Sequence, residues 1–301
     1  MSRSRPLLLG AHMSIAGGLH RAVERGAEVR ATALQVFTRN NTRWAMKPLA
    51  PDAVRDWKAA LRAAPMEVMA HDSYLINLAS PDPALYRKSR HSFLEEALRC
   101  ATLGIPYLVF HPGAHMGRGE TAGLDRIARA LDWTDRRLGG APVALLLENT
   151  AGQGTNLGWR FEHLARILAR VKRPERLGVC IDTCHLLAAG YDFRSEAGYR
   201  SVFADLDRTV GLDHVRAFHL NDSKGDLGCR VDRHENIGKG FVGSRAFRLL
   251  LQDPRFARAP KVLETPKAEG MDRRNLALLR RLASLGTGRS SSRSPGTLDG
   301  R

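Results

Sequence analysis

The sequence lacks the features that identify most membrane and secreted proteins. No apolar run approaches the roughly 20 residues that a membrane-spanning helix needs, and the N-terminal LLLG is too short to be the core of a signal peptide. Only four cysteines occur in 301 residues, which excludes a framework of disulfides. We therefore expect a cytoplasmic protein without a membrane-bound segment.

Acidic residues are too few to balance the basic ones. The chain has 47 Lys and Arg against 31 Asp and Glu, a net charge of +16. Residues 286–301, GTGRSSSRSPGTLDGR, contribute +2 of this and have no apolar periodicity, so we expect a disordered tail. The remaining +14 on residues 1–285 favours a polyanionic partner such as nucleic acid. The alternative is that arginine merely follows the base composition of a GC-rich genome.

Nucleotide-binding fingerprints are also missing, since neither GxGxxG nor a P-loop occurs. Instead, short apolar runs alternate with helix-period segments rich in Arg, Ala, Leu and Glu. The runs are LLLGAH (7–12), ALQVFT (33–38), EVMAH (67–71), YLVFH (107–111), VALLLEN (143–149), LGVCID (177–182), VRAFHLN (215–221) and KVLET (261–265). Such runs are typical of parallel strands buried on both faces. Eight strand–helix repeats predict a single-domain (β/α)8 TIM barrel over residues 1–285, with a doubly wound sheet as the alternative.

Side chains that bind metals recur at the ends of the predicted strands. Six consecutive runs carry one at or near their end: His71, His111, Glu148, Asp182, His219 and Glu264. The carboxyl ends of parallel barrel strands converge on one face, where the active sites of these barrels lie. Burying several carboxylates and imidazoles together is costly unless cations compensate them. The pattern therefore predicts a metal site on that face.

Three further candidates follow just beyond the strand ends. His185 lies three residues after Asp182, and Asp232 and His234 form a DxH pair in the loop after the seventh run. In extended backbone, the two side chains of a DxH pair point the same way and suit one ion. Nine nitrogen and oxygen donors in all would hold about three ions, most simply zinc, with manganese or iron as alternatives.

Long motifs around these residues closely resemble the endonuclease IV family of apurinic/apyrimidinic endonucleases. They are HDSYLINLA (71–79), FHPGAH (110–115), LENTAGQGTNLG (147–158), GVCIDTCHLLAAGYD (178–192), HLNDSK (219–224), VDRHENIGKGFVG (231–243) and LET (263–265). The resemblance extends from about residue 10 to residue 266 and leaves out only the extreme N-terminus and the tail.

The resemblance implies a zinc-dependent TIM-barrel hydrolase that cuts DNA on the 5′ side of an abasic site. The products would be a 3′-hydroxyl and a 5′-deoxyribose phosphate, and trimming of 3′ ends in base excision repair is implied as well. The partner would be double-stranded DNA with abasic sites, bound by a monomer without membrane contact. The implied set is three zinc ions per chain, held by His71, His111 and Glu148; by Glu148, Asp182, His219 and Glu264; and by His185, Asp232 and His234.

Two of these carboxylates are also the implied catalytic residues. Glu148 would bridge the first two ions, and Glu264 would orient the water that attacks the phosphate. Asn149, next to Glu148, is a candidate for supporting the ligands from behind. His12 ends the first run, but the family does not use that position as a ligand.

Tyr74 and Leu75 match the family residues that wedge into the duplex at the lesion, although ordinary packing behind the loop is the alternative. The loop TRNNTRWAMKP (38–48) departs from the family pattern. An arginine is usual where this chain has Thr42, and here Arg43 lies one position later. The resemblance therefore leaves open whether Arg43, with Asn40 and Asn41, contacts DNA.

Basic residues near the DxH pair are candidates for contacting phosphates, with solvated surface charge as the alternative. They are Lys224, Arg230, Arg233 and Lys239. Two other functions remain open. A sugar-phosphate isomerase or epimerase of the xylose-isomerase-like barrels would need only one or two metals, and a DNA-binding module would need no open metal site. The third ligand group and the positive charge favour the nuclease.

Cys180 and Cys184 flank Asp182 in CIDTCH, and several roles are conceivable for them. The CxxxC spacing differs from a CxxC redox pair, and a disulfide is unexpected in the cytoplasm. We interpret both as packing residues around the end of the strand.

Overall fold

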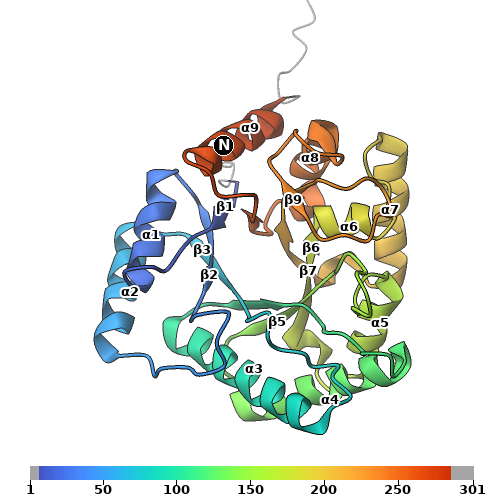
Figure 1. Cartoon of the computed structure of the whole chain (residues 1–301). Helices are drawn as coiled ribbons and strands as arrows, with labels where there is room; N and C mark the ends of the chain where they lie inside the picture. The colour runs from blue at the N-terminus through green and yellow to red at the C-terminus, as the bar shows by residue number, and fades with distance from the viewer. Residues whose placement is uncertain (1–6, 286–301) are drawn as a thin grey trace, which may run out of the picture.

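A closed barrel of eight parallel strands forms the centre of the computed structural model, which describes residues 7–285 (Figure 1). The barrel strands are β1 (Leu9–His12), β2 (Ala33–Phe37), β3 (Glu67–His71), β4 (Tyr107–Phe110), β5 (Ala144–Glu148), β6 (Leu177–Asp182), β7 (Val215–His219) and β10 (Lys261–Leu263). Neighbouring strands pair in parallel, and β1 pairs with β10 to close the ring. The predicted (β/α)8 fold is confirmed.

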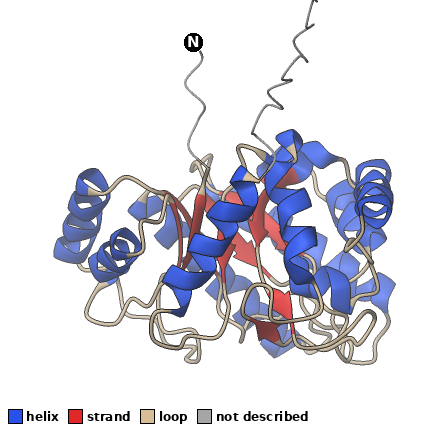
Figure 2. Ribbon diagram, turned by 90° about the horizontal axis from the view of Figure 1, so that it is seen from above, coloured by secondary structure: helices blue, strands red, loops and turns tan. Residues whose placement is uncertain are grey.

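The helices lie outside the strands, as Figure 2 shows. They are α1 (Leu19–Glu28), α2 (Pro51–Ala63), α3 (Pro83–Leu103), α4 (Glu120–Leu138), α5 (Phe161–Arg170), α6 (Thr183–Ala188), α7 (Glu196–Thr209), α8 (Gly243–Gln252) and α9 (Met271–Ser284). Their apolar faces build the main core against the barrel. In α5, for example, Phe161, Leu164, Ile167 and Leu168 are buried, which is the helical period read from the sequence.

The inside of the barrel is a second, smaller core. It consists of Ala33, Met69, Val109, Leu146, Cys180, Ala217 and Val262, and these residues come from seven of the strands. Side chains therefore fill the barrel rather than leaving a pore, as in other barrels of this kind. Cys180 is completely buried here, in the packing role predicted for it.

The loop after β7 contains regular secondary structure. Within it, β8 (Asp222–Ser223) and β9 (His234–Glu235) form a two-stranded antiparallel ribbon. The buried carboxylate of Asp222 fixes the backbone of the loop, because it accepts 2.8 Å hydrogen bonds from the backbone N–H groups of Gly238 and Val242. This arrangement carries Asp232 and His234 over the barrel.

Among residues 7–285, no helix is long and apolar enough to cross a membrane. The tail predicted over residues 286–301 lies outside the described residues.

Candidate metal centre

The nine predicted ligands meet at the carboxyl-terminal mouth of the barrel. His71, Glu148, Asp182 and His219 are the last residues of their strands, and His111 and Glu264 come one residue later. The ligand atoms form three groups, within each of which they lie no more than 4.8 Å apart. The groups are His71, His111 and Glu148; Glu148, Asp182, His219 and Glu264; and His185, Asp232 and His234. These are the groups that the family resemblance implies; a fourth combination, Asp182 and His234 with Cys184, lies within the same distance.

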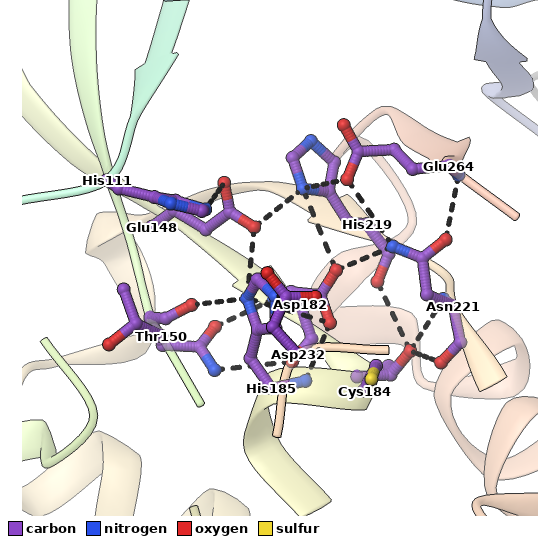
Figure 3. Close-up of polar contacts among 12 residues, drawn as sticks. His111, Glu148, Thr150, Asp182, Cys184, His185, His219, Asn221, Asp232 and Glu264 are labelled. Atoms are coloured by element: carbon purple, nitrogen blue, oxygen red, sulfur yellow. Dashed lines mark hydrogen bonds and ion pairs between the residues drawn. The ribbon is translucent and has the colours of Figure 1, made fainter. Parts of the chain in front are cut away.

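Glu148 lies between the first two groups, as Figure 3 shows for its place between His111 and His219. Its Oε2 is 3.1 Å from Nε2 of His71 and 3.4 Å from Nε2 of His111. Its Oε1 is 2.9 Å from Nδ1 of His219 and 3.3 Å from Nδ1 of His185. The two oxygens of this fully buried carboxylate therefore face different imidazoles, which is the geometry that a bridging ligand requires.

Asp182 ends β6 and also caps α6, which separates it from His185. Its Oδ1 accepts the backbone N–H of His185 at 2.8 Å. Its Oδ2 accepts a 2.6 Å hydrogen bond from the amide of Asn221 and lies 3.9 Å from Nδ1 of His219. The His185 ring turns the other way, toward Asp232. The two residues, three apart in the chain, thus belong to different groups.

The third group contains two ring nitrogens that fit a metal ion. Nδ1 of His185 is 2.9 Å from the carbonyl oxygen of Asn149, and Nδ1 of His234 is 3.2 Å from that of Glu264. Because a carbonyl only accepts, each Nδ1 carries a hydrogen, and Nε2 is the nitrogen that can bind an ion once it is unprotonated. Both Nε2 atoms are buried, make no hydrogen bond to a described residue, and lie 3.2 and 3.3 Å from Oδ1 of Asp232.

Carboxylates and imidazoles compensate one another's charge in this cluster. Burial alone would raise the pKa of Asp232, but His185 and His234 beside it lower that pKa to about 2. Burial would lower the pKa of His71, but its hydrogen bond to Glu148 raises that pKa to about 9. Since an imidazole must lose its proton to become a ligand, metal binding here would release protons.

Three residues behind the ligands connect them to one another. Asn149, predicted as such a partner, exchanges two hydrogen bonds with the backbone of Asp182. Asn221 was missed by the sequence reasoning; besides binding Asp182, its Oδ1 accepts the backbone N–H of Glu264 at 2.7 Å. Its only signal was its place in the HLNDSK motif. Gln35 was missed as well; it lies between His219 and Glu264 and forms a hydrogen bond with each.

A cavity of about 400 Å³ opens above the three groups. Tyr74, Lys224 and Arg233 line it together with several of the candidate ligands. Tyr74 is 60% exposed, although its ring packs edge-on against Phe37 with the centroids 5.6 Å apart. Of the predicted DNA-contacting residues, Tyr74, Lys224 and Arg233 therefore border the metal groups directly. Leu75, beside Tyr74, is half-buried.

The loop after β2 uses several of its polar groups within the protein. Oδ1 of Asn40 accepts hydrogen bonds from the backbone N–H and the hydroxyl of Thr42, at 2.9 and 2.8 Å. The carbonyl of Asn41 accepts from the hydroxyl of Ser73 at 2.6 Å. The side chain of Arg43 is exposed. The side chain of Arg43 is thus accessible to a bound molecule, whereas the side chain of Asn40 stabilises the turn.

These features define a class: barrel enzymes that gather imidazoles and carboxylates for metal ions at the carboxyl ends of their strands. In agreement, a family model described as "Xylose isomerase-like TIM barrel" matches residues 22–282. Within that class, the chain is 52% identical to a protein named "Probable endonuclease 4" from Chloroflexus aurantiacus, over 91% of this chain and 97% of that protein. It is 50% identical to a protein of the same name from Geotalea daltonii, over 90% and 96%. The chain belongs to the endonuclease IV family of apurinic/apyrimidinic endonucleases.

Solved structures agree with this assignment. The crystal structure of endonuclease IV from Thermus thermophilus is 37% identical and superposes with a TM-score of 0.82, covering 92% of this chain and 98% of that one. A D-tagatose 3-epimerase-like protein reaches a TM-score of 0.73 at 17% identity, over 92% and 97%. The second likeness shows the shared barrel fold alone.

Proposed function

We propose that this chain is a zinc-dependent DNA repair endonuclease that hydrolyses the phosphodiester bond on the 5′ side of abasic sites. The products would be a 3′-hydroxyl and a 5′-deoxyribose phosphate. The same site would clean blocked 3′ ends in base excision repair. A monomer working in the cytoplasm on double-stranded DNA is the corresponding expectation.

The observation that carries this proposal is the set of three ligand groups opening into one cavity with an exposed aromatic ring at its edge. Three adjacent groups suit a phosphodiester, whose charge several cations can share. Tyr74 projects beside them, where an aromatic ring could take the place of an extruded nucleotide. The net charge of +16 favours a polyanionic substrate.

Zinc ions held by the three groups would supply an acidified water and positive charge against the phosphate. The residues of the chain do the rest. Glu264 borders the cavity, and we assign to its carboxylate the orientation of the attacking water. The attack forms one P–O bond and breaks the bond from phosphorus to O3′, which leaves as a hydroxyl after taking a proton from solvent. Lys224 and Arg233 line the cavity and would bind backbone phosphates.

A sugar-phosphate isomerase or epimerase is the competing function, because that chemistry occurs on similar barrels. The group of His185, Asp232 and His234 argues against it, since one or two metals suffice for such enzymes. An abasic duplex and a ketose phosphate, offered to the same preparation, would separate the two functions.

The decisive experiment combines metal counting with an incision assay on a duplex with one abasic site. We expect about three ions per chain, mainly zinc with manganese or iron at some sites, and cleavage on the 5′ side. Glu264→Gln should abolish cleavage, a loss of roughly 100-fold or more, because an amide cannot replace the water-orienting carboxylate. The matched control is Glu162→Gln on the exposed face of α5, which should cut normally. One ion per chain, or a fully metallated protein that leaves the duplex intact, would refute the proposal.

A further inference from the structure

Gln35 is a polar residue at the centre of the barrel mouth that belongs neither to the ligands nor to the predicted DNA contacts. It is the third residue of β2 and is completely buried. Its carboxamide makes three hydrogen bonds, to side chains from three other strands or strand ends: His12 of β1, His219 of β7 and Glu264 after β10. Two of these partners are candidate ligands of the second group.

The neighbours of Gln35 determine which way its amide points. Its Nε2 lies 2.6 Å from Oε1 of Glu264, and a carboxylate at that distance only accepts. The amide nitrogen therefore faces Glu264, and its other hydrogen points to Nδ1 of His12 at 3.0 Å. The amide oxygen is left facing Nε2 of His219, at 2.7 Å. The opposite orientation would bring two oxygens together at Glu264.

This orientation sets which atoms of the two ligands face the second group. Because the amide oxygen of Gln35 only accepts, Nε2 of His219 must carry the hydrogen, and Nδ1 becomes the atom that can bind an ion. That Nδ1 is the atom 2.9 Å from Glu148. Glu264 has its Oε1 engaged by Gln35, and its Oε2 lies 3.2 Å from the same Nδ1. One carboxamide thus orients two candidate ligands, His219 from β7 and Glu264 from the end of β10, toward the same ion position.

We infer that Gln35 is a positioning residue of the second ligand group, which holds His219 and Glu264 in the orientation that binds the ion. The inference rests on the metal centre of the proposed function. A methionine of similar length has neither the donor nor the acceptor that these contacts use, and an asparagine is one methylene too short to reach both partners.

The test measures ion retention without any DNA. The metal-loaded chain and its Gln35→Met variant are dialysed against a series of chelator concentrations, and the zinc left per chain is measured. We expect the variant to lose one ion at a chelator concentration roughly 10- to 100-fold lower than the parent chain, which is the usual effect of removing such a partner. Gln252→Met is the matched control, since the Gln252 amide donates to the backbone carbonyls of Leu282 and Leu285, and neither of these residues is a candidate ligand.

A second variant keeps the inference testable if the methionine variant does not fold. Gln35→Asn retains the amide and loses only its reach, so it should show the same early loss of one ion with an unchanged circular dichroism spectrum. Parent-like retention by the folded variants would overturn the inference. The failure of this inference and the failure of the proposed function are distinguishable. If the parent chain does not cut abasic DNA but the variants still lose an ion early, the role of Gln35 is supported and the proposed nuclease function is refuted.

Discussion

Two cysteines flank Asp182, and one of them lies close enough to the centre to need a test. Cys184 can place its Sγ within 4.8 Å of ligand atoms of Asp182 and His234. Burial, however, raises the pKa of Cys180 to about 11 and that of Cys184 to about 12, so both thiols hold their protons at neutral pH. Zinc binds thiolates, whereas the Cys184 thiol keeps its proton and donates it to the backbone carbonyl of Arg233, with Sγ 3.6 Å from that oxygen.

The double variant Cys180→Ala/Cys184→Ala should therefore keep the ion content of the parent chain. It should lose about 1 kcal/mol of stability for each sulfur atom removed from the core. Metal analysis after dialysis and urea unfolding check the two statements separately. Loss of one ion per chain would show that Cys184 is a ligand after all.

Tyr74 offers a second test at the level of one side chain. The ring is 60% exposed at the edge of the cavity, and the neighbouring rings of Phe37 (edge-on) and His71 (tilted) fix its direction. We expect Tyr74→Ala to weaken binding of an abasic duplex by roughly 10-fold, because one stacking contact contributes about 1–3 kcal/mol. Tyr74→Phe should bind like the parent, since it keeps the ring. Equal binding by the alanine variant would mean that the ring only packs against the protein.

The candidate ligands were predictable from the sequence for a simple reason. Strand ends converge in a parallel barrel, so residues as distant as His71 and Glu264 could be placed together from the pattern of runs alone. Gln35 could not be found in this way. It occupies the middle of a run, and nothing local shows that its side chain points toward His219, 184 positions away.

At the level of the elements, a buried ion pair connects the loop after β2 with the loop that carries Tyr74 at the edge of the cavity. Arg39, in the loop after β2, and Glu96, on α3, are 4% and 1% exposed and lie 2.8 Å apart. The same Glu96 oxygen accepts the backbone N–H of Ser73, at the start of the loop that carries Tyr74. Arg39 in turn donates to the backbone carbonyls of Asn40 and Arg43. The pair thus holds the positions of both loops relative to each other.

Removing the charge of Glu96 should therefore affect substrate binding more than chemistry. Glu96→Gln leaves the guanidinium of Arg39 buried without its counter-ion, and we expect a loss of about 2 kcal/mol or more in stability. The KM for an abasic duplex should rise several-fold, while kcat and the ion content stay close to those of the parent. Glu95→Gln is the matched control, because Glu95 is the exposed neighbour. An unchanged KM in the Glu96 variant would show that the loops keep their positions without the pair.

Sequence patterns predicted the barrel strands but not these connections between elements. The strands were predicted to within two residues at each end, since each apolar run has a length that a strand can use. The ribbon of β8 and β9 was not predicted, because two-residue strands show no periodicity. Arg39 and Glu96 are 57 positions apart, and each alone resembles an ordinary surface charge.

At the level of the whole molecule, the two mouths of the barrel have different roles. Placing the chemistry at the carboxyl ends of the strands leaves the opposite mouth to stability. There, Lys261 begins β10 with its side chain buried, and its Nζ lies 2.6 and 2.8 Å from the carbonyl oxygens of Phe256 and Ala259. A neutral amine still has two N–H groups for these two carbonyls. Burial, only partly offset by the charge of Asp253, lowers the pKa of Lys261 to about 8.

This lowered pKa predicts a chain that becomes more stable as the solution becomes moderately alkaline. Lys261 has a pKa of about 8 when folded against 10.5 as its ordinary value, so between these values the unfolded chain binds more protons and stability rises with pH. From about pH 7.5 to about pH 9.5, this one group should add roughly 2 kcal/mol to the free energy of unfolding. Urea unfolding of the parent and of Lys261→Met at both pH values isolates the effect, because every other titrating group is common to the two chains. If the parent and Lys261→Met differed in stability by the same amount at both pH values, Lys261 would be charged in the folded protein. The opposite mouth of the barrel would then have to admit water.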